Sequence, residues 1–224
     1  MSIAGKINDL KTSLPPHVKV VAVSKFHPVS DIREAYDAGQ RLFGENKVQE
    51  LVAKYQQLPE DIQWHFIGTL QTNKVKYIAP FIHTIQSIDS LRLLKEVDRQ
   101  AAKCNRRIRV LLEVHIAEET SKHGFSVDEC MRLFSENQLD EYPNVIISGL
   151  MGMATFTEDT KQVEHEFQLL RQLFDAIGQT GKAGDSFNEL SMGMSDDFQL
   201  AVRNGSTMIR VGTKIFGERR MVEK

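Results

Sequence analysis

The chain has 224 residues, of which 41% are hydrophobic and 26% are charged, as in a globular protein large enough for one sizeable core. The 28 basic and 30 acidic residues leave a net charge of −2, which argues against nucleic acid as a partner. No apolar run approaches the roughly 18 residues that a membrane span needs, and no signal-peptide core begins the chain, so we expect a cytoplasmic protein with no membrane partner.

Strand-like apolar runs and helix-like periodic stretches alternate from one end of the chain to the other. In chain order they predict a leading helix at 4–13, a strand at 18–24, a helix at 29–39, a strand at 41–45, a helix at 46–57, a strand at 62–68, a helix at 71–79, a strand at 81–88, a helix from the N-cap Asp89 to about Cys104, a strand at 107–116, a helix at 126–137, a strand at 145–153, a helix at 159–178, a strand at 187–192, a helix at 196–204, a strand at 207–212 and at most a short final helix. A C-cap glycine at Gly39 and a capping box of Ser126 and Glu129 support these limits.

The alternation amounts to about eight βα units, which predicts an α/β fold with parallel strands and right-handed crossovers. Eight units in 224 residues predict a single (β/α)8 TIM-type barrel, with residues 1–224 forming one domain. The alternative is an open doubly wound sheet. No GxGxxG follows the first strand, which argues against a dinucleotide-binding form of that alternative.

Lys25 directly follows the first buried apolar run, which ends at Ser24. The carboxyl ends of barrel strands carry the chemistry, so this amine is expected at the rim of the site. A fixed, desolvated lysine amine is what Schiff-base formation with an aldehyde requires. The alternative is a strand-end lysine that reaches into solvent.

The loops after the seventh and eighth predicted strands are placed where barrels often bind phosphate. Gly193 permits close backbone approach and Ser195 supplies a hydroxyl, while Gly212 and Thr213 offer backbone N–H groups and a second hydroxyl. Taken singly, Ser195 also fits an N-cap and Gly212 a turn glycine. Their joint occurrence in these two loops predicts a phosphate cradle.

Arg210 lies two residues before Gly212 and shares its strand face, which should point into the barrel mouth. A buried arginine needs a partner, and either a ligand ring nitrogen or the carboxylate of Glu218 would serve. A lysine, a phosphate cradle and this arginine together outline a phosphorylated aldehyde with a pyridine ring, which is pyridoxal 5′-phosphate. A sugar phosphate on an aldolase-type lysine, with no cofactor, is the competing interpretation.

Neither a metal site nor a catalytic base is predicted. Cys104 and Cys130 form no CxxC pair, and the 7 histidines show no HExxH pattern. His65 alternates with Trp64 and Phe66, which favours a satisfied core histidine over a base.

Long and irregular motifs are spread over nearly the whole chain, from about Val18 to Arg219. They are AVSK at 22–25, FGEN at 43–46, WHFIG at 64–68 followed by Gln71 and Asn73-Lys74, SKHG at 121–124, GLMGM at 149–153, LSMGMSDD at 190–197 and IRVGTKIFGER at 209–219. Together they closely resemble the pyridoxal-phosphate homeostasis protein family, with LSMGMSDD and IRVGT as the most specific part.

The resemblance implies a barrel similar to the alanine racemase N-terminal domain, with pyridoxal 5′-phosphate held as a Schiff base on Lys25. It implies that the other cofactor-binding residues are Asn46, Met194, Ser195, Arg210, Gly212 and Thr213, with Arg210 facing the ring nitrogen. One departure is Phe26-His27, where a small polar residue and another lysine are common. This departure argues against a transfer route that uses a second lysine.

The resemblance also implies a role in vitamin B6 homeostasis, in which the protein buffers the cofactor or delivers it to apo enzymes as transient partners, without clear turnover. An arginine does not readily give up its proton, so the ring nitrogen would stay unprotonated and the cofactor would be a poorer electron sink. A pyridoxal-phosphate-dependent amino-acid racemase remains the alternative.

A racemase needs a second acid–base group, which the alanine racemase fold supplies as a tyrosine from a further domain that we expect this chain to lack. Tyr36, Tyr55, Tyr77 and Tyr142 all fall in predicted helices or loops and not at a strand end. We therefore expect no enzymatic turnover. We also expect a monomer, because no unpaired apolar stripe stands out.

Overall fold

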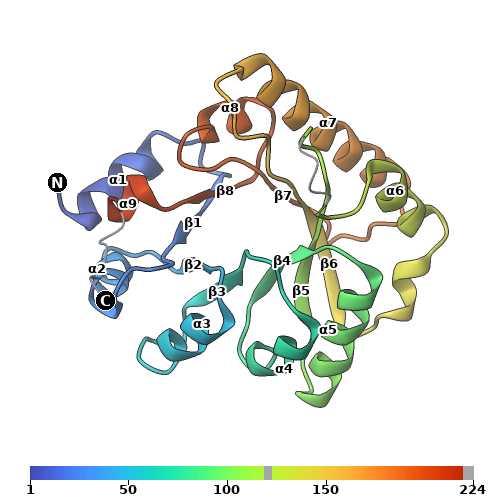
Figure 1. Cartoon of the computed structure of the whole chain (residues 1–224), viewed down its shortest axis with the longest axis horizontal. Coiled ribbons are helices and arrows are strands. Elements are labelled where there is room, and N and C mark those ends of the chain that lie inside the picture. The colour runs from blue at the N-terminus through green and yellow to red at the C-terminus, as the bar shows by residue number, and fades with distance from the viewer. Residues whose placement is uncertain (119–122, 219–224) are drawn as a thin grey trace.

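The computed structural model describes residues 1–118 and 123–218, and within them eight parallel strands close into a barrel in the order β1 to β8 (Figure 1). The strands are β1 (Lys19–Val23), β2 (Leu42–Glu45), β3 (Gln63–Phe66), β4 (Thr84–Ile88), β5 (Ile108–Glu113), β6 (Val145–Met151), β7 (Glu189–Ser191) and β8 (Met208–Val211). Pairing of β1 with β8, from Lys19↔Met208 to Ala22↔Val211, closes the ring. The predicted (β/α)8 barrel is confirmed, and the open doubly wound sheet is wrong.

Helices surround the strands on the outside of the barrel, as Figure 1 shows. They are α1 (Ile3–Thr12), α2 (Val29–Asp37), α3 (Val48–Tyr55), η1 (Thr72–Lys74), α4 (Val75–Ile78), α5 (Leu91–Lys103), α6 (Val127–Ser135), η2 (Gln138–Glu141), α7 (Thr160–Gln179), α8 (Phe198–Arg203) and α9 (Thr213–Phe216). The helix predicted at 71–79 is in fact the 3-10 turn η1 followed by α4. Because α9 is a single turn, α1 completes the cover where it packs against α2 and α9. In the described part of the chain, no helix has both the length and the apolar character needed to cross a lipid bilayer.

Side-chain caps set the starts of α5 and α6. The predicted capping box is confirmed, since Glu129 N–H donates to Ser126 Oγ at 3.2 Å and Ser126 N–H donates to Glu129 Oε2 at 2.9 Å. The predicted N-cap Asp89 is wrong. Ser90 caps α5, because its extended backbone lets its hydroxyl accept from Leu93 N–H at 3.3 Å while donating to Asp89 Oδ1 at 2.8 Å.

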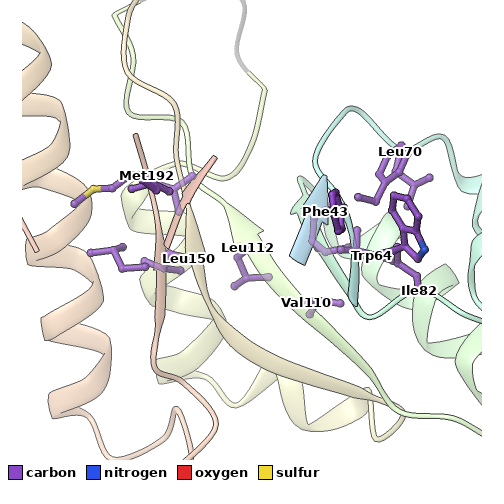
Figure 2. Close-up of a cluster of buried hydrophobic side chains, with 14 of the residues drawn as sticks. Phe43, Trp64, Leu70, Ile82, Val110, Leu112, Leu150 and Met192 are labelled. Atoms are coloured by element: carbon purple, nitrogen blue, oxygen red, sulfur yellow. The ribbon is translucent and has the colours of Figure 1, made fainter. Parts of the chain in front are cut away.

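The outward faces of the strands and the inward faces of the helices form the apolar core (Figure 2). Phe43 of β2 and Trp64 of β3 lie with ring centroids 5.9 Å apart, and both are buried. Leu112 of β5 and Leu150 of β6 are also fully buried. Because successive strand residues alternate between faces, the residues between these point into the barrel interior. Several of those interior residues are polar.

Candidate functional site

A pocket of about 630 Å³ lies at the carboxyl ends of the strands. Its walls include all of the residues that the sequence predicts for the cofactor, namely Lys25, Asn46, Met194, Ser195, Arg210, Gly212 and Thr213. This is the end of a barrel at which enzymes of this architecture place their chemistry. Among the positions of the sequence motifs, 121, 122 and 219 lie outside the described residues.

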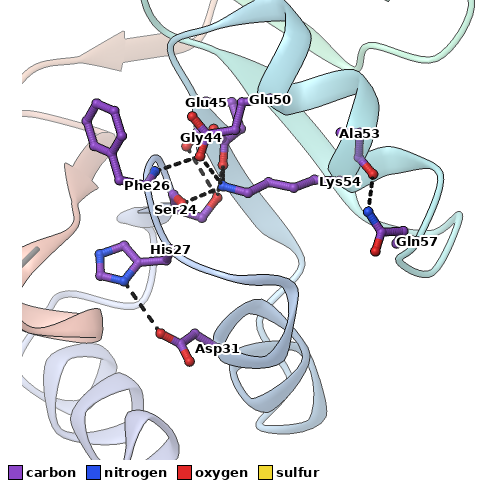
Figure 3. Close-up of polar contacts among 10 residues, drawn as sticks. All are labelled: Ser24, Phe26, His27, Asp31, Gly44, Glu45, Glu50, Ala53, Lys54 and Gln57. Atoms are coloured by element: carbon purple, nitrogen blue, oxygen red, sulfur yellow. Dashed lines mark hydrogen bonds and ion pairs between the residues drawn. The ribbon is translucent and has the colours of Figure 1, made fainter. Parts of the chain in front are cut away.

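Lys25 follows β1 in a turn that side chains of α3 hold in place (Figure 3). Lys54 Nζ donates to the Ser24 carbonyl at 2.7 Å, and Phe26 N–H donates to Glu50 Oε1 at 2.6 Å. Phe26 has a φ of 68°, a left-handed conformation that costs a non-glycine residue about 1–2 kcal/mol. Such strain persists only where the surroundings over-determine it. The backbone on both sides of Lys25 is therefore fixed.

A buried carboxylate completes this support (Figure 3). Glu45, the last residue of β2, accepts hydrogen bonds from Ser24 Oγ at 2.6 Å and from Lys54 Nζ at 2.7 Å. Burial raises the pKa of Glu45 to about 7, and the opposing influence of Lys54 keeps it from rising further. Lys54 also donates to Glu50 Oε1 at 2.7 Å. Sequence reasoning gave these residues no role, although the Glu50 and Lys54 pair at i,i+4 on a predicted helix was a visible signal.

Arg210 of β8 lies buried between the pocket and the barrel interior. Its Nη1 donates to Ser191 Oγ at 2.6 Å and its Nη2 to the Gly152 carbonyl at 3.0 Å. These groups, and not Glu218, are the partners that the structure provides. Burial lowers the pKa of Arg210 to about 10, opposed by Asp197 and Glu113, so the guanidinium stays charged at neutral pH.

The loops after β7 and β8 contact each other at the pocket wall. Gly212 N–H donates to Ser195 Oγ at 3.4 Å. Gly193 has a φ of 97°, and a Cβ there would lie 2.6 Å from Ala201 Cβ, so only glycine lets this loop lie so close to α8. The N-cap of α8 is Asp197, so Ser195 is not the capping residue that the alternative interpretation proposed. Its hydroxyl is available to a ligand.

Asn46, which directly follows β2, lines the pocket and carries an unsatisfied polar atom. Its Oδ1 is buried and has no hydrogen-bond partner among the described residues. A buried unpaired polar atom costs about 1–3 kcal/mol. A ligand that donates a hydrogen bond here would remove that cost.

A chain of hydrogen bonds runs from Arg210 through the barrel interior. Ser191 Oγ, the acceptor for Arg210, donates to Gln86 Oε1 at 2.7 Å, and Gln86 Nε2 donates to His65 Nδ1 at 2.8 Å. Burial lowers the pKa of His65 to about 3, so it is a neutral core histidine. The prediction of a satisfied core histidine is confirmed in part, because Nδ1 is hydrogen-bonded while Nε2 has no partner among the described residues. The signal missed in the sequence was polar residues at alternate strand positions, where barrel interiors usually hold Val, Ile and Leu.

Comparisons with known proteins agree with this architecture. The family model described as "Alanine racemase, N-terminal domain" matches residues 2–220. A curated relative, the pyridoxal phosphate homeostasis protein of Aquifex aeolicus, is 40% identical over 203 residues, which span 90% of this chain and 87% of that protein.

Comparison with solved structures points to the same family. PipY of Synechococcus elongatus, solved without PLP, superposes with a TM-score of 0.91 at 38% identity, over 96% of this chain and 100% of that chain. The same protein with PLP bound superposes with a TM-score of 0.86 over the same shares of both chains. An alanine racemase from Streptomyces coelicolor superposes with a TM-score of 0.79 over 96% of this chain and 57% of that chain, but at 15% identity it shows the fold alone. The chain therefore belongs to the pyridoxal phosphate homeostasis protein family, whose barrel is that of the alanine racemase N-terminal domain.

Proposed function

We propose that this chain binds pyridoxal 5′-phosphate at the carboxyl ends of its strands and buffers or delivers it in the cytoplasm, as a single-domain monomer without turnover of its own. The observation that carries the proposal is the convergence of a strand-end lysine, a buried arginine and two hydroxyl-bearing loops on one pocket. The PLP-bound PipY structure, at 38% identity, supports the choice of cofactor.

The residues present fit the cofactor chemically. When bound, it supplies an aldehyde that condenses with an amine and a ring that withdraws electrons. Lys25 would hold the aldehyde, and Ser195, Gly212 and Thr213 would hold the phosphate. The orphaned Asn46 Oδ1 would gain a partner, Met194 would pack beside the ring, and Arg210 would donate a hydrogen bond to the ring nitrogen.

Two features of the site support the absence of turnover. Arg210 stays charged at neutral pH, so it would donate a hydrogen bond to the ring nitrogen without giving up a proton. Within the described residues, none of the four tyrosines lines this pocket, so none is placed as a second acid–base group. An assay for loss of optical activity of amino acids with the loaded protein tests this part. Measurable racemisation would favour the racemase alternative.

Exposed apolar side chains at the pocket mouth support delivery to other proteins. Met153 is 42% exposed, Phe156 is 90% exposed and Met194 is 37% exposed, and all three line the pocket. Methionine adapts to differently shaped surfaces. Apo enzymes that take up the cofactor are the transient partners we propose for this rim.

We expect the Lys25→Ala variant to lose covalent cofactor binding. Wild-type protein mixed with pyridoxal 5′-phosphate should develop a visible absorption band, and borohydride should then fix the cofactor to the peptide that contains Lys25. The variant should show neither result, because no amine remains at the end of β1. Absorption spectra and peptide mass spectrometry measure both.

Lys47→Ala is the matched control, because Lys47 is a second lysine on the wall of the same pocket. It should keep the absorption band and the fixed cofactor. A wild-type protein that stays colourless with added cofactor would rule out the proposed binding of pyridoxal 5′-phosphate. Fixation of the cofactor on Lys47 would show that the covalent bond forms with Lys47 and not with Lys25.

A Ser195→Ala, Thr213→Val double variant should bind pyridoxal 5′-phosphate at least about 100-fold more weakly than wild type. Each lost hydrogen bond to a charged group is worth about 1.5–3 kcal/mol, and about 1.4 kcal/mol corresponds to tenfold in affinity. Titration of the absorption band measures the change. Pyridoxal, which has no phosphate, should bind both proteins equally.

The control for this pair is Thr69→Val, a similar loss of one hydroxyl on the same pocket wall. It should leave both affinities unchanged. Equal weakening for pyridoxal and its phosphate would show that the two loops do not bind the phosphate.

A further inference from the structure

A second pocket, of about 370 Å³, opens at the amino-terminal end of the barrel. It is lined by the first residues of several strands and their neighbours, and it shares no residue with the pocket around Lys25. Its polar lining includes Lys19, His65, His83, Arg109 and Glu189. The proposed cofactor role makes no use of it.

The hydrogen-bond chain determines which nitrogen of His65 carries the proton. An arginine only donates, so Ser191 Oγ must accept from Arg210 and give its own hydrogen to Gln86 Oε1. The amide of Gln86 is thereby oriented with its NH2 group toward His65 Nδ1, at 2.8 Å. Because Nδ1 of the neutral ring accepts, Nε2 carries the hydrogen. His65 therefore offers an N–H donor.

The electrostatic surroundings of His65 favour an anion. Burial is the main cause that lowers the pKa of His65, and His83, Lys19 and Arg109 lower it further in that order, so positive groups surround the ring. Lys19 forms an ion pair with Glu189 Oε1. The side chain of Arg109, which is half-buried, forms no hydrogen bond or ion pair with any described residue. One positive charge of the pocket is therefore unmatched.

Two buried polar atoms of the lining have no partner within the described chain, His65 Nε2 and Glu189 Oε2. Their residues are 1% and 4% exposed, so bulk water does not solvate them freely. Each unsatisfied atom costs about 1–3 kcal/mol. His65 lies on β3 and Glu189 on β7, on opposite sides of the eight-stranded ring. The lining of the pocket thus holds a buried donor and a buried acceptor without partners, on opposite sides of the barrel.

We propose that this pocket binds a small amino carboxylate, with its carboxylate on Arg109 and the N–H of His65 and its ammonium group on Glu189. The carboxylate neutralises the unmatched arginine, since a guanidinium and a carboxylate form charge-assisted hydrogen bonds. The ammonium supplies the donor that Glu189 Oε2 lacks. A ligand with only one of these groups leaves one buried atom unsatisfied, which is the basis of selectivity.

Calorimetry on the full chain purified free of cofactor tests the proposal, because no aldehyde is then present to react with an amine. The probes are glycine, β-alanine and 4-aminobutyrate, with propionate and butyrate as the counterparts that lack the ammonium group. We expect the best amino carboxylate to bind at least tenfold more tightly than its counterpart. Failure of every probe to bind at millimolar concentration would overturn the proposal and leave the proposed cofactor role untouched.

Two variants assign the contacts. Arg109→Gln should weaken all five probes at least tenfold, whereas Glu189→Gln should weaken the amino carboxylates and leave propionate and butyrate unchanged. Arg107→Gln is the matched control, since Arg107 is an exposed arginine outside this pocket, and it should change nothing. Thermal melting checks the fold of each variant. If Glu189→Gln fails to fold, the result for Arg109→Gln, at a half-buried position, still tests the proposal. Unchanged affinity in Arg109→Gln, or equal binding of amino and plain carboxylates, would contradict the assignment.

Discussion

The Lys54→Met variant should have a free energy of unfolding about 3–5 kcal/mol lower than that of the parent chain at pH 8. Lys54 is buried and donates to the Ser24 carbonyl, to Glu45 Oε1 and to Glu50 Oε1, each at 2.7 Å. Methionine matches the lysine side chain as far as Cε but lacks the terminal ammonium group and so offers no donor. The variant therefore leaves a buried carboxylate without its cation and releases the backbone next to Lys25, so cofactor binding should weaken as well. Urea unfolding followed by circular dichroism measures the stability.

The loss of stability in Lys54→Met should become larger as the pH rises. Burial raises the pKa of Glu45 to about 7 in the folded chain, above its ordinary value of 4.5, so the folded state holds this proton more tightly than the unfolded state. The stability that Glu45 contributes is then greatest below about pH 4.5 and declines as the pH rises through about 7. Removing Lys54 takes away the main influence that lowers this pKa. The destabilisation should therefore grow from pH 5 to pH 8, by at most about 1.4 kcal/mol per pH unit.

A double variant isolates the buried charge. Adding Glu45→Gln to Lys54→Met should restore part of the stability at pH 8 and little at pH 5, because the amide carries no charge at either pH. Lys95→Met replaces an exposed lysine of α5 and should change stability by less than about 0.5 kcal/mol. A loss in Lys54→Met that is the same at every pH, with no recovery in the double variant, would contradict the account.

The Gly149→Ala variant should lose more than about 4 kcal/mol of stability or fail to fold. Gly149 of β6 pairs with Glu189 of β7 and has a φ of 153°. A Cβ at this position would overlap the carbonyl of Glu189, which is backbone and cannot rotate away. The β6–β7 pairing would have to open, and a closed barrel has no free edge that absorbs such a shift. Soluble yield and urea unfolding measure the effect.

Gly178→Ala is the matched control within the same chain. Gly178 lies in α7, and an added Cβ there meets no atom within 4 Å. Alanine is a better helix former than glycine, so this variant should gain about 0.5–1 kcal/mol. Equal stability of Gly149→Ala and the parent chain would show that the strands at this position are not packed as described.

The amino-acid sequence was sufficient to predict the order of the elements, the closure into a barrel and the placement of the predicted site residues around one pocket. These depend on regularities that recur within a few residues, such as apolar runs, periodic helices, glycine stops and the Ser126 capping box. The position of Lys25 directly after a buried run is likewise a local fact. In a barrel the carboxyl ends of all strands lie at the same end, so Lys25 and Thr213 are placed on one pocket although they lie far apart in the chain. That these residues bind the cofactor stays a prediction.

Which polar groups pair with each other could not be predicted from the sequence and became visible in the folded structure. Asp89 and Ser90 are both good N-caps by residue type, and the backbone geometry selects Ser90. Arg210 is linked to His65 through Ser191 and Gln86, because the closed ring brings inward-facing residues of distant strands together. Glu45 shares the outward face of β2 with Phe43, so it pairs instead with Lys54 of the helix α3 that packs on that face. The difference lies in how far apart along the chain the interacting residues are. Local patterning follows from neighbours along the chain, whereas the partner of a buried charge is set by long-range packing, which no single segment encodes.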